Sequence, residues 1–167
     1  MELAVKEIAE MQVGIADYKI AREPTRLITL GLGSCVGVSL YDPVKKIGGL
    51  LHIMLPDSTQ FNNITKQAKF ADLGIPLIIK EMQALGVSLN RLQAKLVGGA
   101  QMFSGLDEKM TLNIGHRNAE KSREVLKKIG IRILVEEVGG NRGRTMILDT
   151  MTGQVTIRTL GNKLKVI

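Results

Sequence analysis

Short runs of apolar and β-branched residues, most of them closed by a glycine or a turn sequence, recur along this chain and favour a fold rich in β-strands. In one run Val36, Val38 and Leu40 alternate with smaller or polar residues, and the Asp42-Pro43 pair that follows is a good turn opener. We interpret the runs as strands over residues 12–20, 27–32, 36–42, 47–55, 92–97, 131–138, 144–150 and 154–160.

Two longer stretches, residues 62–86 and 116–129, carry apolar residues at helical spacing. In the first, Ile78, Met82 and Leu85 fall on one face at i, i+4 and i+7, and a glycine follows as a natural stop. The second is amphipathic and also ends at a glycine. The chain is therefore predicted to be α/β, with about two main helices.

The 167 residues are long enough to bury a core, and they contain no repeat, low-complexity tract or Pro/Ser-rich linker. We expect a single domain over residues 1–167, with residues 1–10 as a short helix or an N-terminal extension. Aromatic residues make up only 3% of the chain and tryptophan is absent. This scarcity argues against the exposed aromatic platforms on which single-stranded nucleic acids stack.

The formal net charge of +7 calls for a partner of opposite sign. Nucleic-acid binding needs a clustered basic patch, whereas the basic residues here are scattered, with the densest groups at Lys127, Lys128, Arg142 and Arg144. We therefore expect no nucleic-acid partner and favour an acidic protein surface, since complementary charge steers protein encounters without a special fold.

The sequence also predicts a cellular compartment. One cysteine allows no internal disulfide, which fits a reducing cytosol. The charged N-terminal residues do not resemble a secretory signal, and the longest apolar stretch, residues 47–55, is about half as long as a membrane span. We expect a cytoplasmic protein without membrane insertion.

The single cysteine, Cys35, ends the segment TLGLGSC, where glycine-spaced backbone offers little burial to a structural thiol. A thiol attacks as the thiolate, and a neighbouring imidazole can take its proton. His52 lies on the strand that we pair with the strand after Cys35. Counting outward from the turn at residues 43–46 brings both side chains near the same end of this hairpin. The pair is a candidate nucleophile and base.

An imidazole base needs a partner that fixes its tautomer. Thr29, on the preceding strand, offers a hydroxyl to His52, and Asp57 or Asp42 would be carboxylate alternatives.

The loop before the cysteine has a sequence that could bind an oxyanion through backbone N–H groups. Gly31 and Gly33 let backbone amides come close, and Ser34 with Cys35 could supply N–H donors.

Two plainer interpretations remain, in which the cysteine is a small core hydrophobe and the histidine is a strand residue whose hydrogen bonds are already satisfied. The sequence GLGS is a weak phosphate-loop signal because no GK[ST] follows. One cysteine and two separated histidines give no metal-ligand cluster, so we expect no metal and no cofactor.

Several motifs, taken together, resemble a known family. They are TLGLGSCVGVSLYDP, GGLLHIMLP, FADLGIPLIIKEM, KLVGGAQMF, NIGHRNAE and GIRILVEEVGGNRGRTMILDTMTGQV, in that order. This series is similar to the chemoreceptor glutamine deamidases, the CheD family of chemotaxis, over roughly residues 11–160. The resemblance implies a Cys-His-Thr catalytic set, which here corresponds to Cys35, His52 and Thr29. It also implies two packed β-sheets flanked by helices (α/β/β/α), similar to toxin-type cysteine deamidases.

The implied activity is that of a protein-glutamine glutaminase, which hydrolyses glutamine side-chain amides on the cytoplasmic helices of chemoreceptors. The implied second partner is a CheC-type chemotaxis phosphatase. The glycine pairs at 98–99 and 139–140 either help to shape that binding face or simply end strands. Two alternatives stay open: a non-enzymatic regulator of the phosphatase and receptors, and a cysteine protease or transglutaminase-like acyl transfer.

Overall fold

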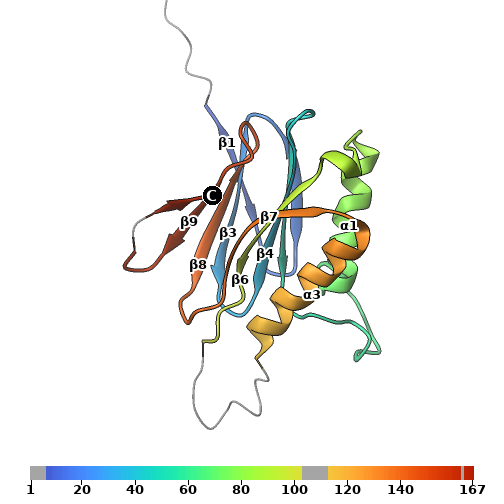
Figure 1. Cartoon of the computed structure of the whole chain (residues 1–167), viewed down its shortest axis with the longest axis vertical. Helices are drawn as coiled ribbons and strands as arrows, with labels where there is room; N and C mark the ends of the chain where they lie inside the picture. The colour runs from blue at the N-terminus through green and yellow to red at the C-terminus, as the bar shows by residue number, and fades with distance from the viewer. Residues whose placement is uncertain (1–6, 103–112, 163) are drawn as a thin grey trace, which may run out of the picture.

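The computed structural model describes residues 7–102, 113–162 and 164–167. Its strands form two five-stranded sheets, sheet A in the order β1-β3-β8-β9-β10 and sheet B in the order β2-β5-β4-β6-β7 (Figure 1). The strands are β1 Ala9–Val13, β2 Tyr18–Arg22, β3 Thr25–Leu32, β4 Val36–Asp42, β5 Ile47–Ile53, β6 Gln93–Gly98, β7 Arg132–Val138, β8 Arg144–Asp149, β9 Val155–Thr159 and β10 Lys165–Val166. The helices are α1 Ala71–Ala84 and α3 Ile114–Ile129, with short 3-10 turns at Gln67–Lys69 and Leu89–Arg91.

Sheet B is the middle layer of the described structure. Sheet A packs on one of its faces, and both α-helices pack on the other (Figure 1). Because side chains alternate along a strand, Leu50 enters the core between the sheets and Leu51 enters the core under the helices. β4 and β5 are buried along their whole length, since both of their faces are covered.

The predicted α/β class with two packed sheets is confirmed. Within the described residues the layer order is sheet A, sheet B, helices, because α1 and α3 lie side by side on sheet B. None of the described helices has the length and apolar content needed to span a bilayer. Residues 1–6 lie outside the described residues, and Ala9 and Glu10 from the expected extension belong to β1.

The strand predicted over residues 12–20 is wrong, because the chain turns there and passes from sheet A to sheet B. Ala16 has a positive φ of 57°, which no strand residue adopts, and the Asp17 carboxylate accepts the Tyr18 N–H. The apolar alternation continues through this turn, so the pattern alone does not show the break.

The helix predicted over residues 62–86 begins only at Ala71. The preceding segment is anchored instead by Asp72, whose carboxylate accepts the backbone N–H and the hydroxyl of Ser58. The short strand β10 was not predicted, because two residues carry no periodic signal. The remaining predicted strands and the helix at 116–129 are confirmed to within about two residues.

Candidate active site

Thr29 and His52 meet between the two sheets. Thr29 lies on β3 of sheet A and His52 on β5 of sheet B, and both are fully buried. Thr29 Oγ1 lies 2.7 Å from His52 Nδ1. The structure therefore brings together the hydroxyl and the imidazole that the sequence had suggested as partners, whereas it holds both carboxylate alternatives elsewhere.

The hydrogen bonds of Thr29 fix the tautomer of His52. A threonine hydroxyl has one proton to donate, and Thr29 Oγ1 donates it to the carbonyl oxygen of Val13 at 2.8 Å. Oγ1 must then accept from His52, so Nδ1 carries the imidazole proton and Nε2 carries the lone pair. Nε2 is buried and has no hydrogen-bond partner among the described residues. His52 thus presents an unoccupied base atom.

Burial lowers the pKa of His52 from 6.5 to about 4, because the charged imidazolium loses its hydration inside the protein. No carboxylate is hydrogen-bonded to the ring within the described chain, and Thr29 supplies only a neutral acceptor. The resting imidazole is therefore neutral at physiological pH.

Cys35 lies on the connection between β3 and β4 and is partly buried. His52 pairs with Gly37, two residues after Cys35, and Cys35 packs against the buried residues between the two sheets, on the side of sheet B that carries His52. Burial raises the pKa of the Cys35 thiol, while its own backbone N–H acts in the opposite direction. No hydrogen bond joins the thiol to His52 Nε2 in the described structure. The pair is thus a neutral thiol beside a neutral imidazole.

Glycines next to the site allow backbone to pack against the cysteine. Gly98 has a φ of 110°, and a Cβ added there would lie 2.4 Å from the Cys35 carbonyl oxygen. The Gly99 N–H donates to that oxygen at 2.8 Å. Gly98 and Gly99 therefore form a strand-end turn that holds the cysteine backbone, a contact that the sequence did not predict, and their part in a partner-binding face stays a prediction.

The N–H groups of the loop before the cysteine differ in their bonding. The Gly33 N–H is occupied, since it donates to Gly31 O at 3.0 Å, and the Gly33 carbonyl accepts the Ala100 N–H. Within the described part of the chain, the N–H groups of Ser34 and Cys35 donate to no carbonyl. Of the expected oxyanion donors, the Gly33 N–H is thus already engaged within the loop, and an oxyanion role for Ser34 stays a prediction.

The turn between β1 and β2 supports the histidine in a way that the sequence did not reveal. The Ala16 N–H donates to His52 O and the His52 N–H donates to Asp17 O, each at 3.0 Å. Val13, at the start of the same turn, accepts the Thr29 proton. Ile15 lies between these contacts and is 53% exposed. The turn thus fixes the backbone of His52 while leaving an apolar side chain at the surface.

Asn118, on α3, is a second residue that sequence reasoning missed. It is fully buried, and its Nδ2 donates to the carbonyl oxygens of Ser34 and Met54, each at 2.9 Å. Its partners lie 84 and 64 residues away in the chain, so no local pattern indicates the contact.

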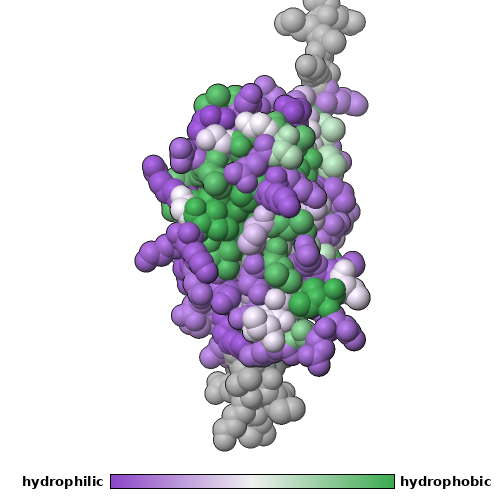
Figure 2. Space-filling view, turned by 90° about the vertical axis from the view of Figure 1, so that its right-hand side faces the viewer, coloured by the Kyte–Doolittle hydropathy of each residue, from purple (hydrophilic) through white to green (hydrophobic). Residues whose placement is uncertain are grey.

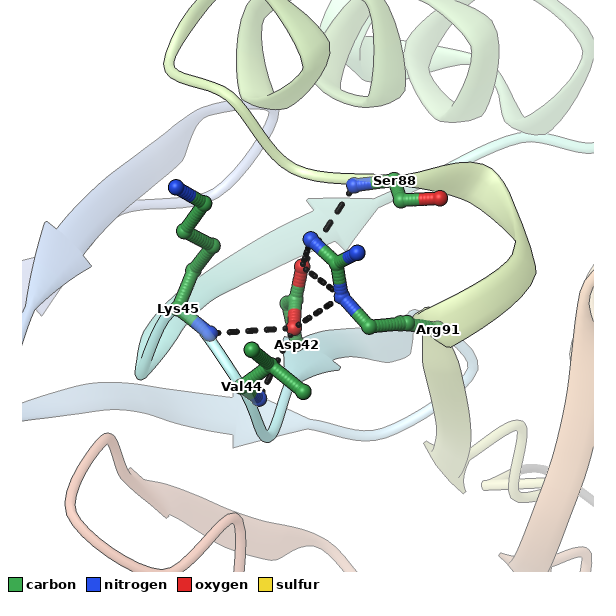
Figure 3. A network of polar contacts seen from close by, with 5 residues as sticks. All are labelled: Asp42, Val44, Lys45, Ser88 and Arg91. Carbon is green, nitrogen blue, oxygen red and sulfur yellow. Dashed lines mark hydrogen bonds and ion pairs between the residues drawn. The ribbon is translucent and has the colours of Figure 1, made fainter.

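The carboxylates weighed as partners for His52 lie elsewhere. Asp42 pairs with Ile47 at the far end of the β4–β5 hairpin, about 16 Å along the strand from Gly37. Its pKa is lowered because hydrogen bonds to its carboxylate outweigh the opposing effect of burial. Figure 3 shows these bonds, which come from Val44, Lys45, Ser88 and Arg91. Asp57 is held by Thr59 and Lys121 instead.

Other surface features lie apart from this site. The helix-covered side carries a hydrophobic patch edged by hydrophilic residues (Figure 2). A groove between α3 and β7 is lined by Arg123, Lys127, Gly130, Ile131, Arg132, Ile133, Leu134, Val135 and Glu136, and includes none of the three candidate catalytic residues. Within the described residues no three His, Cys, Asp or Glu side chains gather closely enough to hold a metal ion.

Comparisons with known proteins give close relatives. A family model described as CheD chemotactic sensory transduction matches residues 54–159. A Desulforamulus reducens protein named "Probable chemoreceptor glutamine deamidase CheD" is 73% identical, and the alignment covers 100% of both chains. A Clostridium kluyveri protein of the same name is 57% identical over 95% of this chain and 98% of its own.

Solved structures give more distant similarities. The Bacillus licheniformis protein YfiH aligns with a TM-score of 0.48 at 17% identity, covering 74% of this chain and 51% of its own. A Neisseria meningitidis protein of family DUF152 aligns with a TM-score of 0.47 at 12% identity, covering 80% of this chain and 64% of its own.

Proposed function

The chain belongs to the CheD family, and we propose that it is a protein-glutamine glutaminase that deamidates glutamine side chains of chemoreceptors. The observation that carries the proposal is the buried Thr29–His52 pair, which leaves Nε2 of His52 unoccupied on the face that Cys35 shares. The full-length similarity to proteins named as chemoreceptor glutamine deamidases supports the same activity.

In the first half of the reaction Cys35 is the nucleophile and His52 the base. Nε2 accepts the thiol proton as the sulfur attacks the carboxamide carbon, and the carbonyl π electrons move onto its oxygen. Because the pKa of His52 is low and that of Cys35 is raised, no stable ion pair precedes the attack. The thiol and Nε2 approach each other in the substrate complex, as catalytic hydrogen bonds often do.

The N–H groups of Ser34 and Cys35 bind the developing oxyanion in this scheme, which is supported by the lack of a carbonyl partner for either group among the described residues. Collapse of the tetrahedral intermediate breaks the C–N bond, and the Nε2 proton leaves with the amine as ammonia. A thioester between Cys35 and the substrate remains. Throughout the reaction, Thr29 Oγ1 accepts a hydrogen bond from the Nδ1–H group of His52, which leaves Nε2 as the atom that exchanges protons.

In the second half, water attacks the thioester carbon while Nε2 takes one of its protons. The second tetrahedral intermediate expels the Cys35 sulfur, which recovers its proton from Nε2. The product is glutamate, and the enzyme returns to its starting state. The overall reaction consumes one water and releases one ammonia for each glutamine. None of its steps requires a metal or an organic cofactor.

We propose that the substrate glutamines lie on the cytoplasmic helices of the receptor, so that the protein acts in the cytoplasm. The net charge of +7 suits docking on helices rich in acidic residues. Ile15 offers an exposed apolar contact beside the backbone of His52. Binding that weakens as salt increases would support this electrostatic part, and an affinity independent of salt would contradict it.

The test is deamidation of a purified receptor cytoplasmic fragment. Each converted glutamine gains about 1 Da as its amide nitrogen is exchanged for oxygen in the acyl-transfer route. The wild-type protein should produce such conversions, and Cys35→Ala, folded by circular dichroism, should produce none. Conversion at the wild-type rate by Cys35→Ala would overturn the assignment of the nucleophile.

Family membership also suggests a CheC-type chemotaxis phosphatase as a second partner. Calorimetric titration with that phosphatase, with and without the receptor fragment, tests this binding and any competition. If wild-type protein binds both partners but converts no glutamine, the alternative of a non-enzymatic regulator replaces the enzyme. If a cleaved or cross-linked receptor appears instead, the chemistry is proteolysis or transglutaminase-like acyl transfer.

A further inference from the structure

We propose that Asn118 is a positioning residue that sets the spacing between Cys35 and His52, an inference that rests on the proposed function. Its amide group ties the chain just before the nucleophile to the chain just after the base. No other described side chain donates hydrogen bonds to both Ser34 and Met54.

The two catalytic segments diverge where Asn118 lies. The β4–β5 ladder ends at the pair Val36–Ile53. Beyond it, the N–H groups of Met54 and Leu55 both donate to Lys69 O, so β5 leaves its partner. The hydrogen bonds that would continue the ladder past Val36 are therefore missing on the side of Cys35.

Asn118 replaces those missing hydrogen bonds. Its two Nδ2 protons go to Ser34 O and Met54 O, each at 2.9 Å, one on either side of the gap. Flipping the amide would set Oδ1 against two carbonyl oxygens, so the hydrogen-bond pattern allows one orientation only. An aspartate of the same shape could not make these bonds.

The helix that carries Asn118 is itself held against the site. A Cβ at Gly115 would lie 2.4 Å from Ala100 O and 2.6 Å from Gly99 O, so α3 begins directly on the turn that binds the Cys35 carbonyl. This close contact fixes the position of the helix that carries Asn118.

The two Nδ2 bonds are the hydrogen bonds that the Asn118 amide makes within the described residues. Oδ1 of Asn118 is buried and has no hydrogen-bond partner among the described residues. The contacts to Ser34 and Met54 therefore orient this side chain.

The experiment compares Asn118→Asp and Asn118→Ala with Asp42→Asn. The matched control Asp42 is also fully buried and holds backbone groups, but at the opposite end of the same hairpin (Figure 3). Each variant is assayed on the receptor fragment for kcat and KM. Alkylation of Cys35 is followed against pH in the absence of substrate, and its signal is unambiguous because the chain has one cysteine.

Both Asn118 variants should lower kcat about 100-fold, the effect of a misplacement near 1 Å, with KM changed less than about threefold. They should also speed alkylation, because Cys35 is no longer held in its partly buried position. Asp42→Asn should lower the Tm by about 5 °C and leave kcat and the alkylation profile unchanged. Asn118→Ser, with one donor, should give intermediate values and serves if the other two variants fold poorly.

Three outcomes would overturn the inference. The first is wild-type kcat and alkylation in the Asn118 variants. The second is an equal loss of kcat in Asp42→Asn, which would show that general stability is responsible. The third is a loss that falls on KM alone. Failure of the proposed function is distinguishable, since wild-type protein would then convert no glutamine while the alkylation comparison could still be made.

Discussion

Thr29 Oγ1 lies 2.7 Å from His52 Nδ1 and donates its only proton to Val13 O, so the hydroxyl serves the imidazole as an acceptor. This relationship joins sheet A to sheet B and assigns the lone pair of His52 to Nε2. Within the described residues, a hydroxyl thus fixes the tautomer of the candidate base, and no carboxylate is bonded to the ring.

Thr29→Val keeps the shape of the side chain and removes the acceptor. We expect kcat to fall at least about 100-fold, because the imidazole can then adopt the tautomer whose Nε2 carries the proton. Nitrogen NMR of labelled histidine should show the Nδ1–H form in the wild type and a mixture in the variant. Thr29→Ser, which keeps the hydroxyl, should retain the wild-type tautomer. A single Nδ1–H form in Thr29→Val would contradict this role.

The buried His52 should make stability depend on pH. Its pKa is about 4 in the folded chain against 6.5 for an ordinary histidine, so the unfolded chain binds more protons between these values. The stabilisation is fully present above about pH 6.5 and is lost as pH falls towards 4, by at most about 3 kcal/mol. Urea unfolding at both pH values should show this loss in the wild type and a smaller one in His52→Gln. Equal losses would argue against a buried neutral imidazole.

Cys35 should behave as a thiol of low acidity in the free protein. Burial raises its pKa, and no imidazolium is present to lower it. Its alkylation by iodoacetamide should therefore become rapid only above the pH at which an ordinary thiol ionises. A midpoint at or below the ordinary value would instead indicate a preformed thiolate–imidazolium pair.

Gly98→Ala should damage the site through the backbone of Cys35. A Cβ there would lie 2.4 Å from the Cys35 carbonyl oxygen, at a residue with a φ of 110°. We expect a stability loss of about 2–3 kcal/mol together with loss of activity. Gly130→Ala is the matched control, since Gly130 also has a positive φ of 93° but no atom within 4 Å of an added Cβ. Gly130→Ala should lower the free energy of unfolding by about 1 kcal/mol and leave kcat unchanged. Equal effects of the two substitutions on kcat would exclude a specific contact with Cys35.

The sequence predicted the parts of this site that depend on local patterns. Strand alternation and the Asp42-Pro43 turn were enough to pair the strand of His52 with the strand after Cys35, and that pairing is confirmed. Thr29 followed because a base needs an orienting partner on a neighbouring strand. Its carboxylate competitors could be excluded only with coordinates, which place Asp42 at the other end of the hairpin.

The residues that were missed act over long separations. Asn118 reaches Ser34 and Met54 across 84 and 64 residues, and nothing in the helix pattern distinguishes it from any other buried position. The turn at Ala16 was hidden because apolar alternation runs through it. The glycine pair after β6 was noticed, but only the packing against Cys35 O gives it a role.

The most direct test of the central claim is to run the receptor reaction in water labelled with heavy oxygen. With wild-type protein, each new glutamate should carry one oxygen from the solvent, because the water that hydrolyses the Cys35 thioester supplies the oxygen that replaces the amide nitrogen. Cys35→Ala and His52→Gln should yield no labelled glutamate. Labelled glutamate formed at the wild-type rate by either variant, or none formed by the wild type, would contradict catalysis by this cysteine and its neutral imidazole.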